Sequence, residues 1–374
     1  MKPILKFKGI NSILNSSDGP VYVLSDISFQ INRGKIIGLV GESGSGKTQL
    51  SMAAVGMQNL TPGVVGGAVT VNKDGDEISI YPKEGNESNN IFQDSDNNFF
   101  RKNQGTFNRK VMKNTQILKR DFFGWIPQEP KNYLNPFWKL KRLFQESYNL
   151  RKKNDDDFEF SDLKSFAQHY LDEVDLKSKD ALEKFPHELS GGECQRAMIA
   201  FVLSKKPDFL IADETTTGLD VSRQKKIINL FKKIKSHHKD LTIILISHDF
   251  GFLDHLVDHY MVMYGGFLVE HISDKSMIKN PTSLHPYTRD LLNRLWNKDD
   301  QLSDFHDELS SRVDLHGKLT GCPYMDLCSI INKGEKEYSK KCKTELPPIV
   351  SSKNAEDIID LTHSWRRCWR DLYE

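Results

Sequence analysis

The feature that most constrains this chain's fold is the octapeptide GESGSGKT at residues 41–48. It fits the pattern G-x-x-x-x-G-K-[ST], follows the apolar run GKIIGLV, and leads into KTQLSMAAVGM, which is rich in good helix formers. A strand, a glycine-rich loop and a helix in this order form a site where backbone N–H groups surround phosphate oxygens. The alternative is a chance glycine-rich turn, which the flanking strand and helix disfavour.

Residue types within this loop predict specific contacts to a nucleoside triphosphate and its magnesium ion. Lys47 is expected to bridge the β- and γ-phosphates, and Thr48 to place its hydroxyl on Mg²⁺. The other residues predicted to contact the nucleotide are Gly41, Ser43, Gly44, Ser45, Gly46 and Gln49.

Two further apolar runs end in polar residues and fit buried parallel strands whose carboxyl ends carry function. FLIADE ends in Asp213, a predicted Mg²⁺ ligand, and Glu214, a predicted general base that polarises the attacking water. The alternative is two acids that cap a strand. LTIILISHD contains His248, expected to contact the γ-phosphate, although a lone histidine is more often structural.

Length, net charge and hydropathy limit which kinds of partner and cellular location this chain is expected to have. Its 374 residues suggest two units, and its formal net charge of +1 gives no global field that favours nucleic acid. No apolar run approaches the roughly 18–20 residues of a membrane span. The start, MKPILKFKGI, lacks the apolar region of a secretory signal. We expect a cytosolic chain that reaches a membrane only through a partner.

LSGGECQR at 189–196 is a turn of short side chains at a predicted helix start, where backbone N–H groups can hold an anion. Together with the loop at 41–48, the acidic strand end, GLD at 218–220 and His248, it resembles an ABC transporter ATPase subunit over nearly the whole chain. The resemblance implies an α/β P-loop NTPase fold of the ABC type, with a RecA-like core, a β subdomain, a helical subdomain and a C-terminal cysteine-containing extension.

The same resemblance implies that two ATPase domains pair head to tail. The signature LSGGE of one domain then faces the γ-phosphate held by the phosphate-binding (Walker A) loop of the other. Residues expected to make this contact in trans are Ser190, Gly191, Gly192, Glu193 and Asp220. Glu193 stands where glutamine is commonest in the family.

The family's glutamine loop has two candidates here. Gln93 lies in NIFQDSDNN, and Gln128 lies in FFGWIPQEPKNYLNP, where the apolar lead, Pro130 and LNP also match. We choose Gln128, predicted to touch Mg²⁺ or the attacking water. The aromatic residue that usually stacks on adenine is replaced by Leu14, and Tyr22 is a weak substitute.

DGPVYVLSDISF, FPHELSGGECQRAMIA, VMYGGFLVE and HPYTRDLL are similar to the oligopeptide/dipeptide importer ATPases, a branch that includes nickel importers. Its members carry a cysteine-bearing tail, represented here by Cys322, Cys328, Cys342 and Cys368. Similar tails bind a 4Fe-4S cluster. Four thiolates could equally hold Zn²⁺. The third alternative is that the tail binds no metal. Cys194 is expected to be a bystander.

We therefore expect an ATP-hydrolysing subunit of an oligopeptide or dipeptide importer, on the cytoplasmic face of the membrane. Its expected partners are a second ABC ATPase subunit, which the resemblance implies is a paralogue, two permease subunits and an extracytoplasmic substrate-binding protein. Alternatives are a nickel or metal-chelate importer, a soluble ABC ATPase, or a cluster-binding sensor.

The predicted organisation is an ATPase domain at 1–272 and an extension at 273–374. The ATPase domain would hold a helical subdomain at about 129–195 and an insertion at about 66–120. Residues near 129–150 would meet the permease.

Overall fold

The computed structural model describes residues 3–82, 91–94, 98–177, 180–215, 221–279, 281–296, 315–316, 319–332, 336–351, 361 and 363–369. Its chain forms two compact units. The first consists of residues 1–116 and 248–374, and the second of residues 117–247. No helix in the described ranges is both long and apolar enough to cross a bilayer.

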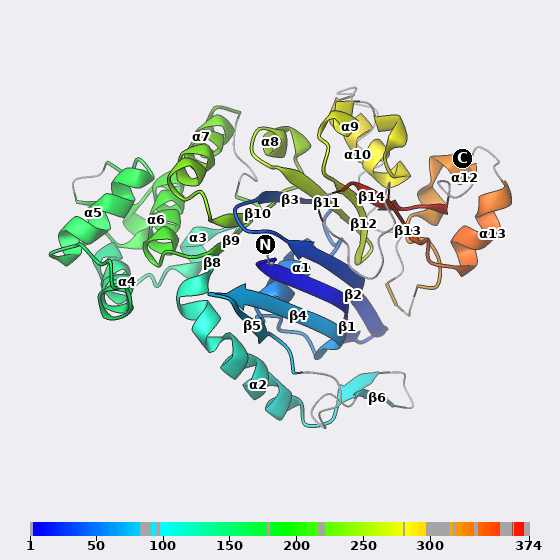
Figure 1. Ribbon diagram of the computed structural model, residues 1–374, viewed down its shortest axis with the longest axis horizontal. Helices are drawn as coiled ribbons and strands as arrows, with labels where there is room; N and C mark the ends of the chain where they lie inside the picture. The colour runs from blue at the N-terminus through cyan, green and yellow to red at the C-terminus, as the bar shows by residue number, and fades with distance from the viewer. Residues whose placement is uncertain are drawn as a thin grey trace. The chain divides into compact units, whose positions relative to one another are not determined.

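An antiparallel sheet forms one part of the first unit (Figure 1). Its order is β2 (Gly19–Ile31), β1 (Leu5–Ser16), β4 (Pro62–Lys73) and β5 (Asp76–Ser79). Buried and more exposed residues largely alternate along β1, as expected for a strand with one covered face. On that face Phe7 stacks on Phe29 with 4.6 Å between ring centroids. Residues 66–73, where we expected an insertion to begin, lie in β4 and pair with β1.

The remainder of the expected insertion contains a short hairpin and a helix. β6 (Ile91–Gln93) pairs antiparallel with β7 (Phe99–Arg101), and α2 (Gln104–Ile117) follows. Phe107, Val111 and Thr115 recur every four residues on α2 and form its buried stripe. The described residues from 91 to 117 thus lie mostly in regular elements.

A second sheet of the first unit carries the phosphate-binding loop. β3 (Ile36–Val40) is buried at every position, pairs parallel with β11 (His259–Tyr264), and leads into the loop before α1 (Lys47–Ala54). β11 and β12 (Phe267–Ile272) form the hairpin predicted from YMVMYGGFLVE. β14 (Trp365–Arg367) pairs with β12, and β13 (Ile349–Ser351) pairs with β14, so the chain's last described segments extend this sheet.

Short helices complete the first unit. They are α8 (Phe250–Asp254), α9 (Ser276–Lys279), α10 (Pro286–Trp296), α12 (Ser329–Asn332) and α13 (Lys336–Thr344), with 3₁₀ turns at Pro281–Ser283 and Met325–Leu327. Proline at the first position of α10 suits a helix start, because that residue's N–H would have no partner in the helix.

The second unit combines parallel strands with helices. β10 (Thr242–Ile246), β9 (Phe209–Asp213) and β8 (Phe123–Ile126) lie side by side, and every residue of β9 and β10 is buried. This confirms the two buried parallel strands predicted from FLIADE and LTIILISHD. β8 follows a π-helix at Leu118–Phe122.

Helices fill most of the rest of this unit. They are α3 (Pro130–Tyr133), α4 (Leu140–Asn154), α5 (Leu163–Glu173), α6 (Gly191–Ser204) and α7 (Val221–His237), with 3₁₀ turns at Ala181–Glu183 and Pro186–Glu188. The side chains of Phe144, Phe166 and Tyr170 are buried. In β8, a side chain at Gly124 would come within 2.9 Å of Leu210 and also meet Val202 of α6. Glycine there allows α6 to pack closely on the sheet.

Candidate nucleotide-binding and hydrolysis site

The loop at 41–48 has a backbone that only glycine tolerates at several positions. Gly46, the N-cap residue of α1, has φ 101°, in the left-handed region. A side chain at Gly41 would collide with the Met263 carbonyl and lie 2.7 Å from the Ser45 hydroxyl. The loop therefore closes tightly on the strand beside it, as the phosphate-binding pattern predicts.

Lys47 lies at the head of this loop. Its ammonium group donates to the backbone carbonyls of Gly41 at 2.8 Å and Glu42 at 2.7 Å. The side chain is buried, whereas Ser43 and Gly44 at the tip of the loop are exposed. Thr48 and Gln49 begin α1 and are half-buried. An anion approaching the tip would meet exposed backbone.

Within the second unit, Asp213 ends β9 and Glu214 follows it directly. The Asp213 side chain is buried, and Glu214 has φ 43°, a conformation rare for a residue with a side chain. Such backbone strain costs on the order of 1–3 kcal/mol and clusters at functional sites. The Glu214 N–H donates to the Ile246 carbonyl at 3.0 Å, which fixes this turn to the end of β10.

Gln128 and Glu214 come together although 86 residues separate them in the chain. The Gln128 side-chain amide donates to the Glu214 carboxylate across 3.0 Å. Gln93 instead lies exposed in the β6–β7 hairpin. Gln128 is thus the glutamine that reaches the predicted general base.

His248 belongs to the first unit, at the entry to α8. Its side chain is exposed. The next residue, Asp249, caps α8 by accepting a hydrogen bond from the Phe252 N–H at 3.0 Å. The cap fixes the backbone directly after His248.

The signature at 189–193 forms the start of α6, with Ser190 as N-cap. The Ser190 hydroxyl accepts from the Glu193 N–H at 3.3 Å, and the Glu193 carboxylate accepts from the Ser190 N–H at 2.9 Å. This is a capping box. The bond from the Ser190 N–H lowers the pKa of Glu193, so its carboxylate is charged at neutral pH.

Among the described residues, packing gives no reason for glycine at Gly191 or Gly192. A side chain at either position would have no atom within 4 Å, among the residues that the structure describes. Both positions are exposed. The two glycines therefore keep an open surface at the start of α6.

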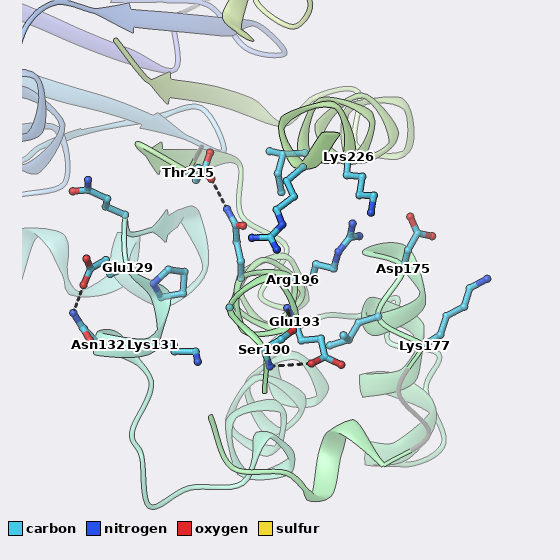
Figure 2. A pocket seen from close by; sticks show the side chains of 18 residues that line it. Glu129, Lys131, Asn132, Asp175, Lys177, Ser190, Glu193, Arg196, Thr215 and Lys226 are labelled. Carbon is cyan, nitrogen blue, oxygen red and sulfur yellow. Dashed lines mark hydrogen bonds between the residues drawn. The ribbon is translucent and has the colours of Figure 1, made fainter. Parts of the chain in front are cut away.

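A cavity of about 950 Å³ lies in front of this surface (Figure 2). Its lining comes from segments 128–132, 175–177, 190–196 and 223–227, together with Thr215. Gln195 of α6, also a lining residue, donates to the Thr215 carbonyl at 2.7 Å. Five of the lining side chains are basic: Lys131, Lys177, Arg196, Arg223 and Lys226. Three are acidic: Glu129, Asp175 and Glu193. Sequence reasoning missed this basic set, because its members come from separate segments.

The predicted adenine contacts lie in the antiparallel sheet. Leu14 pairs with Val21 across β1 and β2, and Tyr22 meets the edge of the Phe99 ring with 6.1 Å between centroids. Burial raises the pKa of Tyr22. Asp220, predicted to contact a partner's nucleotide, lies outside the described residues.

The four tail cysteines gather in the first unit. The Cys322 N–H donates to the Cys342 carbonyl at 2.8 Å, and Cys328 and Cys342 are buried. Burial raises the pKa of Cys322, and interaction with the thiols of Cys342, Cys368 and Cys328 raises it further. Burial and the neighbouring thiols raise the pKa of Cys342 to about 11.

The thiols are therefore near enough for their charges to interact. Over the described stretches, however, no three His, Cys, Asp or Glu side chains are arranged to hold a metal ion. Cys194 is buried in α6, in the other unit.

Comparisons with known proteins agree with this geometry. The family model described as ABC transporter matches residues 24–217. The oligopeptide transport ATP-binding protein OppD of Haemophilus influenzae is 31% identical over 329 residues, 88% of this chain and 90% of that protein. The oligopeptide transport ATP-binding protein OppF of Streptococcus mutans is 32% identical over 294 residues, 78% of this chain and 81% of that one.

Among solved structures, the ATP-binding cassette MJ0796, as a post-hydrolysis dimer bound to ADP and Pi, shares the fold. Its TM-score is 0.53 at 19% identity, and the match covers 72% of this chain and 99% of that one. The phosphate-binding loop, the acidic end of β9, the signature turn and these similarities lead to one conclusion. The chain belongs to the ABC transporter family.

Proposed function

We propose that this ABC ATPase powers the import of oligopeptides or dipeptides. The hydrogen bond between Gln128 and Glu214 carries the hydrolytic part of the proposal, because it places a glutamine on the predicted base. Similarity to OppD over 88% of the chain supports the cargo class. Nickel or a metal chelate is the second candidate cargo, because the similar branch includes nickel importers.

In the proposed reaction, each residue has a distinct role. Asp213 and Thr48 would supply oxygen ligands of the kind that Mg²⁺ prefers, and a bound ion would supply positive charge that offsets the phosphates. Lys47 would bind the β- and γ-phosphates. Glu214 would accept a proton from the attacking water while Gln128 orients that water, and His248 would hold the γ-phosphate.

A second ATPase subunit would complete the site. The exposed Gly191 and Gly192 and the basic cavity beside them support docking of a partner's triphosphate at the start of α6. Ser190, Glu193 and Asp220 would share that contact. Relatives are named both OppD and OppF, which favours a pair of different subunits. A dimer is also the state of the MJ0796 cassette.

The permease would dock on the face that follows Gln128. A groove of about 680 Å³ lies there, lined by Phe137, Trp138 and Phe185 among basic side chains. Phe137 is 85% exposed and Tyr133 is 66% exposed, which is unusual for aromatic residues without a partner. Two permease subunits and an extracytoplasmic binding protein would complete a transporter, with this chain on the cytoplasmic face.

The organisation at 1–272 and 273–374 would separate the ATPase from its tail. We propose that Cys322, Cys328, Cys342 and Cys368 hold a 4Fe-4S cluster, with Zn²⁺ as the alternative ligand of four thiolates. The backbone hydrogen bond from Cys322 to Cys342, the burial of Cys328 and Cys342, and the effect of the other thiols on the pKa of Cys322 support this.

Metal analysis of anaerobically purified protein tests the tail. Iron and sulfide are expected in wild type and in the Cys194→Ser control, and are expected to be lost in Cys368→Ser. Zinc in place of iron would select the alternative, and absence of both metals would refute the proposal.

Uptake by the assembled transporter tests the cargo. Vesicles holding the complex and its binding protein should hydrolyse ATP faster, and take up label, when given a mixture of short peptides. Nickel salts and nickel chelates serve as the competing substrates. Stimulation by nickel but not by peptides would contradict the proposed cargo while leaving the ATPase assignment intact.

A further inference from the structure

The C-terminal extension contacts the phosphate-binding loop at Glu42. The Glu42 N–H donates to the Tyr287 hydroxyl at 2.9 Å, and Arg294 donates to the Glu42 carboxylate at 2.9 Å. In this ion pair the two side chains are only 15% and 10% exposed. Tyr287 and Arg294 both lie on α10. Because the Glu42 carbonyl also accepts from Lys47, the loop, its lysine and α10 meet at one residue.

Three buried tyrosines connect α10 to the cysteine-bearing tail. The Tyr287 ring lies 4.5 Å from Tyr264 and 5.3 Å from Tyr324, measured between centroids. The Tyr324 hydroxyl donates to Asp290 of α10 at 2.7 Å. Tyr324 follows Cys322 by two residues. The segment that carries the first tail cysteine thus packs directly against the helix that contacts the loop.

This support matters because the loop is otherwise permissive. Gly41, Gly44 and Gly46 all have positive φ, and glycine loses more conformational freedom on ordering than any other residue. Contacts that hold the loop before a nucleotide arrives reduce the ordering cost of binding. Tyr287 is fully buried, which raises its pKa, so its hydroxyl stays neutral at physiological pH.

We propose that Tyr287 and Arg294 are positioning residues that hold the Walker A loop ready for ATP, and that Tyr324 couples this support to the cysteine-bearing tail. Tyr287 and Arg294 act on the backbone and side chain of Glu42. The inference rests on nucleotide binding by this chain and not on the identity of the cargo, so the two can fail separately.

Nucleotide titration of the full chain with a fluorescent ATP analogue and Mg²⁺ tests the proposal. Tyr287→Phe removes one hydroxyl and keeps the ring in the cluster. We expect affinity to fall about three- to tenfold, the size of one lost hydrogen bond. In the assembled complex, KM for ATP should rise by a similar factor while kcat at saturating ATP stays near wild type. A purely structural defect would lower kcat as well as the affinity for ATP.

Tyr264→Phe is the matched control. Its hydroxyl is buried in the same cluster and has no hydrogen-bond partner among the described residues. Loss of that hydroxyl should leave ATP affinity at the wild-type value. If Tyr264→Phe weakens binding as much as Tyr287→Phe, the cluster acts only as packing and the proposal is overturned. A folded Tyr287→Phe protein with wild-type affinity would overturn it as well.

A second pair of variants guards against loss of folding. Arg294→Gln and Glu42→Gln each break the ion pair between α10 and the loop, and the double variant should bind ATP no more weakly than the poorer single variant. Additive losses would show that the two side chains act independently. Tyr324→Phe should also lower the affinity for ATP. An unchanged affinity would contradict the proposed coupling between the tail and the loop.

Discussion

At the scale of single residues, Glu193 has two opposing effects. Its carboxylate closes the capping box with the Ser190 N–H and adds a favourable charge at the N-terminus of α6. The same charge lies in the cavity where a partner's triphosphate is proposed to dock. A glutamine at this position could accept the same hydrogen bond without the repulsion.

Glu193→Gln is therefore expected to lower KM for ATP in the assembled complex about two- to fivefold, the effect of one charge near a helix terminus. The difference should shrink as salt is raised. Glu188→Gln is the matched control, because Glu188 accepts an equivalent bond from the Phe185 N–H at 2.7 Å yet lies outside the cavity lining. A KM that Glu193→Gln leaves unchanged, or that both variants lower alike, would argue against electrostatic repulsion at the signature.

At the scale of elements, α5 and the end of α7 are joined through Glu173. Its side chain is 5% exposed and lies 2.7 Å from the Nε2 of His238 and 3.6 Å from the Nδ1 of His237. Lys233 of α7 adds an ion pair to Asp175 at 2.9 Å, directly after α5. The carboxylate is thus a polar contact between two helices of the second unit.

Acid should weaken this contact. Burial raises the pKa of Glu173, but the hydrogen bond from His238 and the charges of His238, His237 and His169 outweigh it, so the net shift is downward. A lowered pKa in the folded state gives stability that is present above the ordinary value of 4.5 and is lost as pH falls through the folded pKa.

Urea unfolding at a series of pH values checks this prediction. Glu173→Gln should be less stable than wild type at pH 7 by about 1–3 kcal/mol, the cost of a broken buried polar contact. The gap between the two proteins should narrow as pH falls below 4.5 and through the lowered pKa of folded Glu173. Glu183→Gln, which removes an exposed carboxylate paired with Lys139, should change stability little at any pH. A gap between wild type and Glu173→Gln that stays constant throughout the acid range in which both proteins fold would contradict the account.

At the scale of the whole molecule, local patterns predicted local structure well. The glycine-rich loop, the two buried parallel strands and the β11–β12 hairpin are all present where the sequence placed them. Each depends on neighbours within about ten residues, so its signal is contiguous. The capping box at Ser190 and Glu193 also follows a local pattern, S-x-x-E.

Contacts between distant segments were harder to predict. The bonds from Tyr287 and Arg294 to Glu42 span 245 and 252 residues, and no periodicity encodes them. Residues 66–73 of β4 fall within the predicted insertion because their glycines obscure the alternation of a strand, yet pairing with β1 outweighs that weak propensity. The contact between Gln128 and Glu214 could be predicted only from the family resemblance.

The most direct test of the whole account is ATP turnover by the assembled complex that carries Glu214→Gln. If Glu214 is the general base, the variant should keep ATP bound and lose hydrolysis by at least about 100-fold, within the range for general-base catalysis. Bound nucleotide is measured after rapid gel filtration, and released phosphate is measured in the same sample. Hydrolysis at the wild-type rate in that complex would contradict the account.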